Sequence, residues 1–189
     1  PDPDTAQWVA SGDGRWWLRY PDGSYPANER VVRDGVTYSF DANGWMKTGW
    51  QVEDGAWRYY APSGAMASGW TAVGGNWYYL DPDSGAMATG WLKDGDTWYY
   101  LHDSGAMATG WVNLGGAWFY LNGNGSMATG WANLGGTWYY LTESGQMAIG
   151  WVKDGGSWYF CHPSGAMATG RVVIGGTAYT FDGSGRWVA

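Results

Sequence analysis

The chain has 189 residues, with 33 glycines, 17 tryptophans and a formal net charge of −7. It shows no long helical pattern, and because aliphatic core residues are scarce, aromatic side chains must supply most of the buried surface. The negative charge argues against nucleic acid as a partner, and no apolar run is long enough to span a bilayer.

The N-terminal part is irregular. Residues 1–7 have the polar, proline-containing composition of a linker end, so we expect another segment before them. Residues 8–49 contain two degenerate repeats. In the second of these, Arg30 and Thr37 occupy the positions that tryptophan takes in later repeats, while Tyr38 is kept. We expect this hairpin to form without an aromatic face and to close no ligand site.

Residues 50–170 form a regular array with a period of about 20 residues, which is typical of a repeat protein rather than of one globular core. Each repeat opens with a tryptophan and places a Gly-Gly, Asp-Gly or Gly-Asp pair four and five residues later. Such pairs favour tight turns with positive φ, and the flanking aromatics favour strands. The predicted fold is all-β, a solenoid (superhelix) of short repeated β-hairpins. The opening tryptophans are Trp50, Trp70, Trp91, Trp111, Trp131 and Trp151.

The turn position also predicts the strand register. If Gly74-Gly75 closes the turn, Trp70 pairs with Tyr79 and Ala72 pairs with Trp77. Strand alternation then places these four side chains on one face of the hairpin and Tyr78 on the other. One face of each regular repeat therefore carries three large aromatics.

Residues 171–189 are predicted to be a C-terminal capping repeat. Arg171 and Ala178 replace both tryptophans, while Gly175-Gly176 preserves the turn. A stacked array needs atypical terminal repeats to stop its own growth. The terminal repeats could also pair two copies of the chain as a homodimer.

Catalytic and metal-binding groups are not recognisable in the sequence. His102 and His162 have no base or nucleophile at a fixed spacing, and Asp81 with Asp83 supplies too few ligands for calcium. Cys161 stands where other repeats carry leucine, so we predict a buried small hydrophobe without a disulfide partner. We predict no enzymatic activity, no cofactor and no metal, although an enzymatic domain could lie outside this sequence.

The repeated string Gly-Trp, a glycine-closed turn, Trp-Tyr-Tyr-Leu and Ser-Gly-Ala-Met-Ala-Thr-Gly-Trp resembles the choline-binding, cell-wall-binding repeats of surface proteins and lysins from Gram-positive bacteria and their phages. The resemblance covers residues 45 to 170 closely and the flanks loosely. Related repeats in glucan-binding proteins and clostridial toxins share parts of the string. The motif is therefore more specific for the superfamily than for the ligand.

The resemblance implies choline sites between consecutive hairpins, each built from two tryptophans and an aromatic ring of the next hairpin, with a methionine nearby. The methionines are expected mainly to pack between hairpins. In the sixth site Thr180 stands where the ring is expected, so only Tyr179 could complete it. Strand parity favours the second tyrosine of each pair, and Tyr78, Tyr99 and their equivalents remain alternatives. The implied sets are Trp50, Trp57, Met66 and Tyr79; Trp70, Trp77, Met87 and Tyr100; Trp91, Trp98, Met107 and Tyr120; Trp111, Trp118, Met127 and Tyr140; and Trp131, Trp138, Met147 and Phe160.

A trimethylammonium group has no hydrogen to donate, so its recognition depends on aromatic faces and desolvation. The resemblance thus implies a secreted, non-catalytic module that attaches to the cell wall by binding choline of teichoic or lipoteichoic acids. The alternative is a module that binds a carbohydrate, a glucan or the peptidoglycan glycan, by stacking sugars on the same rings.

Overall fold

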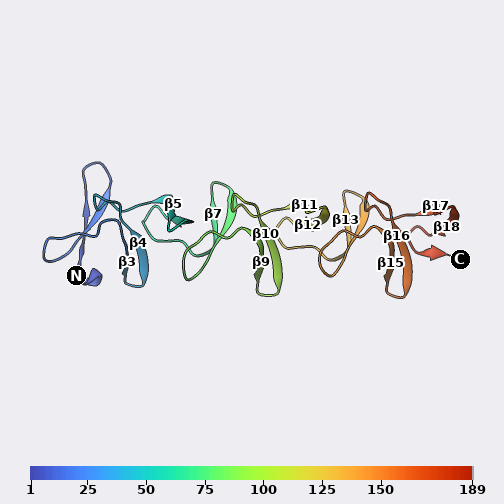
Figure 1. Ribbon diagram of the computed structural model, residues 1–189, viewed down its shortest axis with the longest axis horizontal. Coiled ribbons are helices and arrows are strands. Elements are labelled where there is room, and N and C mark those ends of the chain that lie inside the picture. Colours follow the sequence, from blue (N-terminus) through green and yellow to red (C-terminus); the bar gives the residue numbers. More distant parts are fainter. Residues whose placement is uncertain (189) are drawn as a thin grey trace. The chain divides into compact units, whose positions relative to one another are not determined.

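The computed structural model describes residues 1–188, and within them the structure is β apart from one short 3-10 turn, η1 (Pro3–Thr5). Antiparallel hairpins follow one another about 20 residues apart, so the predicted all-β hairpin array is confirmed (Figure 1). The N-terminal strands are β1 (Gln7–Ala10), β2 (Trp16–Arg19), β3 (Arg30–Arg33) and β4 (Val36–Ser39). The regular repeats supply β5 (Gly49–Glu53), β6 (Ala56–Tyr60), β7 (Gly69–Val73), β8 (Asn76–Leu80), β9 (Gly90–Asp94), β10 (Thr97–Leu101), β11 (Gly110–Leu114), β12 (Ala117–Leu121), β13 (Gly130–Leu134), β14 (Thr137–Leu141), β15 (Gly150–Asp154) and β16 (Ser157–Cys161). The last strands are β17 (Gly170–Ile174), β18 (Thr177–Phe181) and β19 (Trp187–Val188).

The chain divides into two compact units, and the division falls within the hairpin β9–β10. The first unit comprises residues 1–90 and 101–107, and the second comprises residues 91–100 and 108–189. In the second unit β19 adds a third strand to the last hairpin, β17–β18. No helix among residues 1–188 is long and apolar enough to cross a membrane.

Tight turns set the register of each hairpin. Gly115 and Gly116 have φ values of 61° and 91°, which only glycine adopts without strain. In the hairpin β7–β8, Trp70 pairs with Tyr79 and Ala72 pairs with Trp77. The predicted register is confirmed.

The loop after each regular hairpin connects it to the preceding one. Met87 forms a β-bridge with Leu80 of its own hairpin, and its backbone N–H donates to the carbonyl of Trp57 at 2.8 Å. The same bond joins Met147 to Trp118, at 2.7 Å. From Met87 onward, the methionine of each loop therefore lies between its own hairpin and the second tryptophan of the preceding hairpin.

A buried side chain lies at the end of the second strand of each hairpin, or one residue from it. Cys161 is one of them, and its exposed fraction of 0% confirms the prediction of a small buried hydrophobe. Burial raises the pKa of its thiol to about 11, so the thiol stays protonated and unreactive near neutral pH. The corresponding side chains are Leu18, Phe40, Tyr60, Leu80, Leu101, Leu121, Leu141 and Phe181.

Residues 1–7, which the sequence suggests are a linker end, contact the second hairpin. The guanidinium of Arg33 donates to the carbonyl of Ala6 at 2.6 Å, and the backbone N–H of Asp34 donates to the Asp4 carboxylate at 2.9 Å. Ala6 is 3% exposed and belongs to the hydrophobic cluster of the first two hairpins. The segment thus covers the apolar surface of the hairpins that follow it.

Candidate ligand-binding pockets

The aromatic clusters form where one hairpin meets the next. In the first unit, the Trp50 ring lies 5.1 Å from Tyr59 on its own hairpin and 4.8 Å from Tyr78 on the next, centroid to centroid. Trp57 stands nearly perpendicular to Trp50, with the centroids 6.4 Å apart. Edge-to-face rings at these distances attract one another, so the cluster has a defined shape before any ligand arrives.

These rings leave an open pocket of about 320 Å³ in the first unit. Its walls are Trp50, Trp57, Tyr78 and Met87, with Asp103 and Ser104 at the rim. The Trp57 side chain is 48% exposed. A large indole that is only half buried contributes less to stability than a core residue would, which favours a role in binding.

The second unit repeats the arrangement independently. Trp91 lies 5.0 Å from Phe119 of the next hairpin, and Trp98 stands at 89° to Trp91. The pocket has a volume of about 350 Å³ and is also lined by Met127, Glu143 and Ser144. The rings of Trp111 and Tyr139, of Trp131 and Tyr159, and of Trp151 and Tyr179 meet at 5.0, 4.8 and 5.0 Å.

The aromatic ring that each hairpin contributes to the preceding one differs from the ring that parity favoured. Tyr78, not Tyr79, reaches Trp50, while Tyr79 packs against Trp70 of its own hairpin at 5.3 Å. The reason is that each hairpin has two neighbours, so its two faces serve different pockets. The other expected rings likewise lie on their own hairpins: Tyr100 on Trp91, Tyr120 on Trp111, Tyr140 on Trp131 and Phe160 on Trp151, at 5.0 to 5.4 Å.

The methionine assignments were also wrong, by one repeat. The backbone N–H of Met66, which the resemblance groups with Trp50 and Trp57, donates instead to the carbonyl of Thr37. The methionine loop folds back toward the hairpin before its own, a contact that the spacing within one repeat cannot reveal. The observed backbone bonds join Met87 to Trp57, Met107 to Trp77, Met127 to Trp98, Met147 to Trp118 and Met167 to Trp138.

A pocket also forms at the N-terminus, where none was expected. Trp8 and Tyr38 meet at 5.0 Å, and together with Trp16 and Met46 they line a pocket of about 330 Å³. The expectation failed because the hairpin β3–β4 lacks tryptophans for its own pocket yet still supplies a ring to the preceding one. The retained Tyr38 is the feature of the sequence that could have indicated this site.

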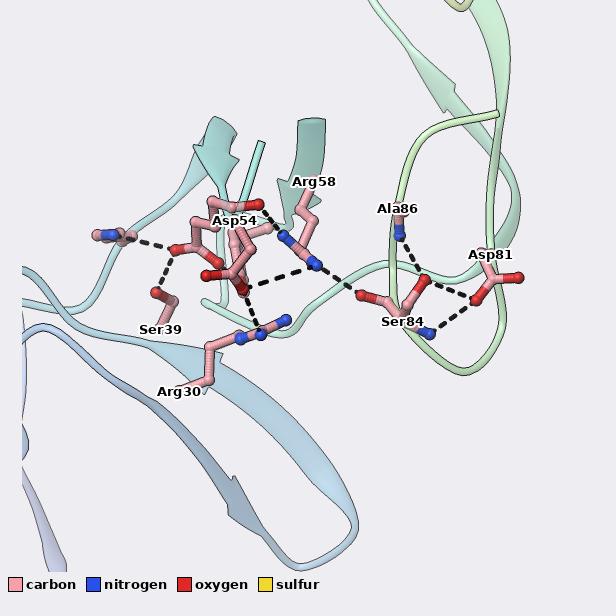
Figure 2. A network of polar contacts seen from close by, with 10 residues as sticks. Arg30, Ser39, Asp54, Arg58, Asp81, Ser84 and Ala86 are labelled. Atoms are coloured by element: carbon pink, nitrogen blue, oxygen red, sulfur yellow. Dashed lines mark hydrogen bonds and ion pairs between the residues drawn. The ribbon is translucent and has the colours of Figure 1, made fainter. Parts of the chain in front are cut away.

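The hairpin β3–β4 makes a polar joint with β5–β6 instead of an aromatic pocket. The Asp54 carboxylate lies between the guanidinium groups of Arg30, at 2.7 Å, and Arg58, at 4.0 Å (Figure 2). Arg58 is 5% exposed and stands where Tyr78 stands one repeat later. Its Nε donates to the carbonyl of Ser84 at 2.8 Å. At this joint, charge pairs replace the ring contacts.

Glu53 completes the polar joint. It accepts hydrogen bonds from Ser39, from Tyr60 at 2.7 Å and from Lys47 at 3.0 Å. Burial by itself would raise the pKa of Glu53, but these three donors outweigh burial and lower it below its ordinary value. Burial and the bond to Glu53 raise the pKa of Tyr60 to about 12, so the phenol remains a donor at neutral pH.

The C-terminal cluster contains a substitution at the methionine position. Thr180 pairs with Arg171, and the ring facing Trp151 comes from Tyr179, the residue that the sequence offers in place of Thr180. Trp187 follows the last loop at the place of methionine in earlier repeats, and its ring lies 6.0 Å from Trp151. The last cluster is therefore built from aromatic rings alone.

No group of three or more His, Cys, Asp or Glu side chains within residues 1–188 could hold a metal ion. The His162 ring lies against Phe160, with the centroids 5.9 Å apart. What the described residues do assemble, in both units, is a recurring aromatic pocket with a methionine wall.

The fold and these pockets define a β-hairpin repeat module with ligand-sized aromatic pockets at its joints. The family model of the choline-binding repeat matches residues 29–69, 67–109 and 108–150, and a model of the cell wall binding repeat matches residues 149–167. The chain belongs to the choline-binding repeat family. A search of curated proteins found no match.

Solved structures agree with this assignment. The chain is similar to CbpJ from Streptococcus pneumoniae TIGR4, with 36% identity and a TM-score of 0.85 over 93% of this chain and 70% of that chain. It is similar to choline binding protein F from Streptococcus pneumoniae, with 37% identity and a TM-score of 0.80 over 92% and 70% of the two chains. The choline-binding domain of CbpL from Streptococcus pneumoniae matches over 98% of both chains, with 31% identity and a TM-score of 0.70.

Proposed function

We propose that the chain is a secreted, non-catalytic module that attaches to the cell wall by binding choline groups of teichoic or lipoteichoic acids. The supporting observation is one pocket type, formed separately in the two units, in which two tryptophans, a third ring and a methionine surround 320 to 350 Å³. The faces of the rings attract a cation that has no hydrogen-bond donor.

The energies fit a multivalent attachment module. At about 0.5 to 2 kcal/mol per ring, three rings supply a few kcal/mol, which corresponds to a roughly millimolar affinity for a single head group. Several such pockets on one chain gain avidity on a polymer that repeats the ligand. Weak individual sites and firm attachment are therefore compatible.

The second candidate ligand is a carbohydrate. Choline binding protein F, a relative of this chain, was crystallised with a tetrasaccharide-pentapeptide peptidoglycan analogue, and aromatic rings also stack on sugars. Sugar recognition additionally needs polar side chains beside the rings. The residue opposite the second tryptophan varies among repeats, for example Val52, Asn113 and Lys153, which favours choline.

Calorimetric titration with choline and with glucose oligomers, followed in parallel by tryptophan fluorescence, tests the proposal. We expect choline to bind and Trp118→Leu to remove about one site. The matched control is Trp45→Leu, because the Trp45 ring lies under Arg15, 3.9 Å from its guanidinium carbon, and lines none of the pockets described above. Binding of the glucan without binding of choline would overturn the proposal in favour of a carbohydrate module.

A further inference from the structure

The rims of the aromatic pockets differ, although their walls are alike. The rim of each pocket comes from a loop farther along the chain. This loop follows the hairpin two places after the hairpin that carries the two tryptophans. It supplies Asp103 to the pocket of Trp50 and Glu143 to the pocket of Trp91. The N-terminal pocket has Pro62 at the same loop position. The three pockets are built in the same way, and two of them have an acidic residue at the rim.

We propose that Asp103 and Glu143 are specificity-determining residues whose carboxylates make these two pockets select a cationic head group over a neutral one of the same shape. This inference rests on the proposed function, because it concerns the ligand of the same pockets. The aromatic walls recognise an apolar, rounded group through contact area as well as charge. A carboxylate at the rim adds a charge interaction that only a cation can use.

Backbone hydrogen bonds fix the loop that carries each of these two acidic residues. In the first unit the backbone N–H of Gly105 donates to the carbonyl of His102 at 2.7 Å, which closes a tight turn around Asp103 and Ser104. In the second unit the backbone N–H of Gly145 donates to Thr142 at 2.8 Å, around Glu143. Because both turns are closed by backbone bonds, neutral side chains can replace the carboxylates without altering the loops.

The sequence contains a matched control at the same loop position. Asp83 precedes Ser84 as Asp103 precedes Ser104, but the Ser84 carbonyl faces Arg58 in the polar joint, where no aromatic pocket exists. In the other later repeats the position holds Gly123, Pro163 and Gly183, which are uncharged. An effect of charge on ligand affinity should therefore be lost when Asp103 and Glu143 are neutralised, but not when Asp83 is neutralised.

The probes are choline and its neutral carbon isostere, in which a tert-butyl group replaces the trimethylammonium. Each is titrated into the wild type, the double variant Asp103→Asn/Glu143→Gln and the control Asp83→Asn, at low and at high sodium chloride. We expect the double variant to lose about two- to fivefold in choline affinity at two sites in low salt. Affinity for the isostere should be unchanged, and Asp83→Asn should behave as wild type.

Salt should reproduce the effect of the substitutions. High sodium chloride screens exposed charges, so it should weaken the two wild-type sites toward the affinity of the double variant and leave the variant nearly unaffected. Asp103→Glu should retain wild-type binding, since Glu143 shows that either acid can occupy the position. Equal losses for choline and the isostere, or a choline affinity unchanged by the double substitution, overturn the inference while the proposed function stands. Failure of wild type to bind choline overturns both.

Discussion

Adjacent aromatic residues on one strand serve different pockets. Tyr139 faces Trp111 of the preceding hairpin, and Tyr140 faces Trp131 of its own hairpin, each at 5.0 Å. Strand alternation separates the two rings by placing them on opposite faces. The doubled aromatic at the end of each repeat therefore has a structural explanation: one ring shapes the hairpin's own cluster and the other completes its neighbour's.

A double-mutant cycle tests this division at the residue scale. Trp111→Leu combined with Tyr139→Leu should show a coupling of about 0.5 to 1.5 kcal/mol in the free energy of unfolding, the usual worth of an edge-to-face pair. Trp111→Leu combined with Tyr140→Leu is the control and should be additive. Urea unfolding of the single and double variants measures both couplings. Coupling to Tyr140 alone would contradict the observed arrangement.

At the scale of the element, the loops depend on glycine for two separable reasons. Gly145 has φ of 81°, and a Cβ added there would lie 2.3 Å from the sulfur of Met127. Gly135 in a hairpin turn has φ of 64° but open space around it. Comparing the two positions separates backbone strain from a clash with the methionine that lines the pocket.

Gly135→Ala should cost about 1 to 2 kcal/mol of stability, from the left-handed backbone alone. Gly145→Ala should cost about 1 to 3 kcal/mol more, because the methyl group displaces Met127. Adding Met127→Ala should recover part of the extra loss at Gly145 and none at Gly135. Thermal unfolding of these variants measures the differences in stability. Equal losses of stability at the two glycines would show that Met127 is not tightly packed against Gly145.

The polar joint makes the stability of the first unit depend on pH. Since the folded state lowers the pKa of Glu53 below its ordinary value of 4.5, the ionised group stabilises the fold above that pH. The stabilisation should be lost as the pH falls through the lowered pKa. Glu53→Gln should be less stable than wild type at neutral pH, and the difference should shrink in acid. The free energy of unfolding of both proteins is measured from pH 7 to pH 3. A difference between them that stays constant over this range would contradict the prediction.

At the scale of the whole molecule, a ligand held between hairpins should stabilise the folded state. A ligand that binds only the native state adds RT ln(1 + [L]/Kd) per site, about 1.4 kcal/mol at ten times Kd. Cys161 offers an internal reporter, because it is fully buried in a hydrophobic cluster against which Trp131, Tyr140 and Met167 pack.

Labelling of Cys161 by a thiol reagent should therefore require local opening of the second unit. We expect slow labelling at neutral pH, and slower labelling still with choline at several times its Kd. Glucose oligomers at the same concentration are the control. Rapid labelling that choline does not change would show that the ligand leaves the stability of this region unaltered.

The homodimer expected through the terminal repeats stays a prediction. Trp187 and Val188 at the C-terminal end are each 42% exposed and could take part in such a contact. Sedimentation with and without choline would decide the oligomeric state. Loss of a dimer in Trp187→Ala would place the contact at the last hairpin.

The sequence by itself determined the hairpins, their period and their register. These features depend on neighbouring residues: a glycine pair that accepts positive φ fixes the turn, and alternation fixes which side chains share a face. Trp70 opposite Tyr79 could be predicted for that reason. The burial of Cys161 followed in the same way from its equivalent position in other repeats.

Only the tertiary structure decided which residues of different hairpins meet. Tyr78 rather than Tyr79 faces Trp50, and Met87 rather than Met66 lines its pocket, because the rotation from one hairpin to the next is not encoded within a single repeat. Asp103 reaches that pocket from two hairpins farther on, beyond any spacing that a repeat unit displays. The packing of successive hairpins sets these contacts, and it depends on loop paths and ring contacts together.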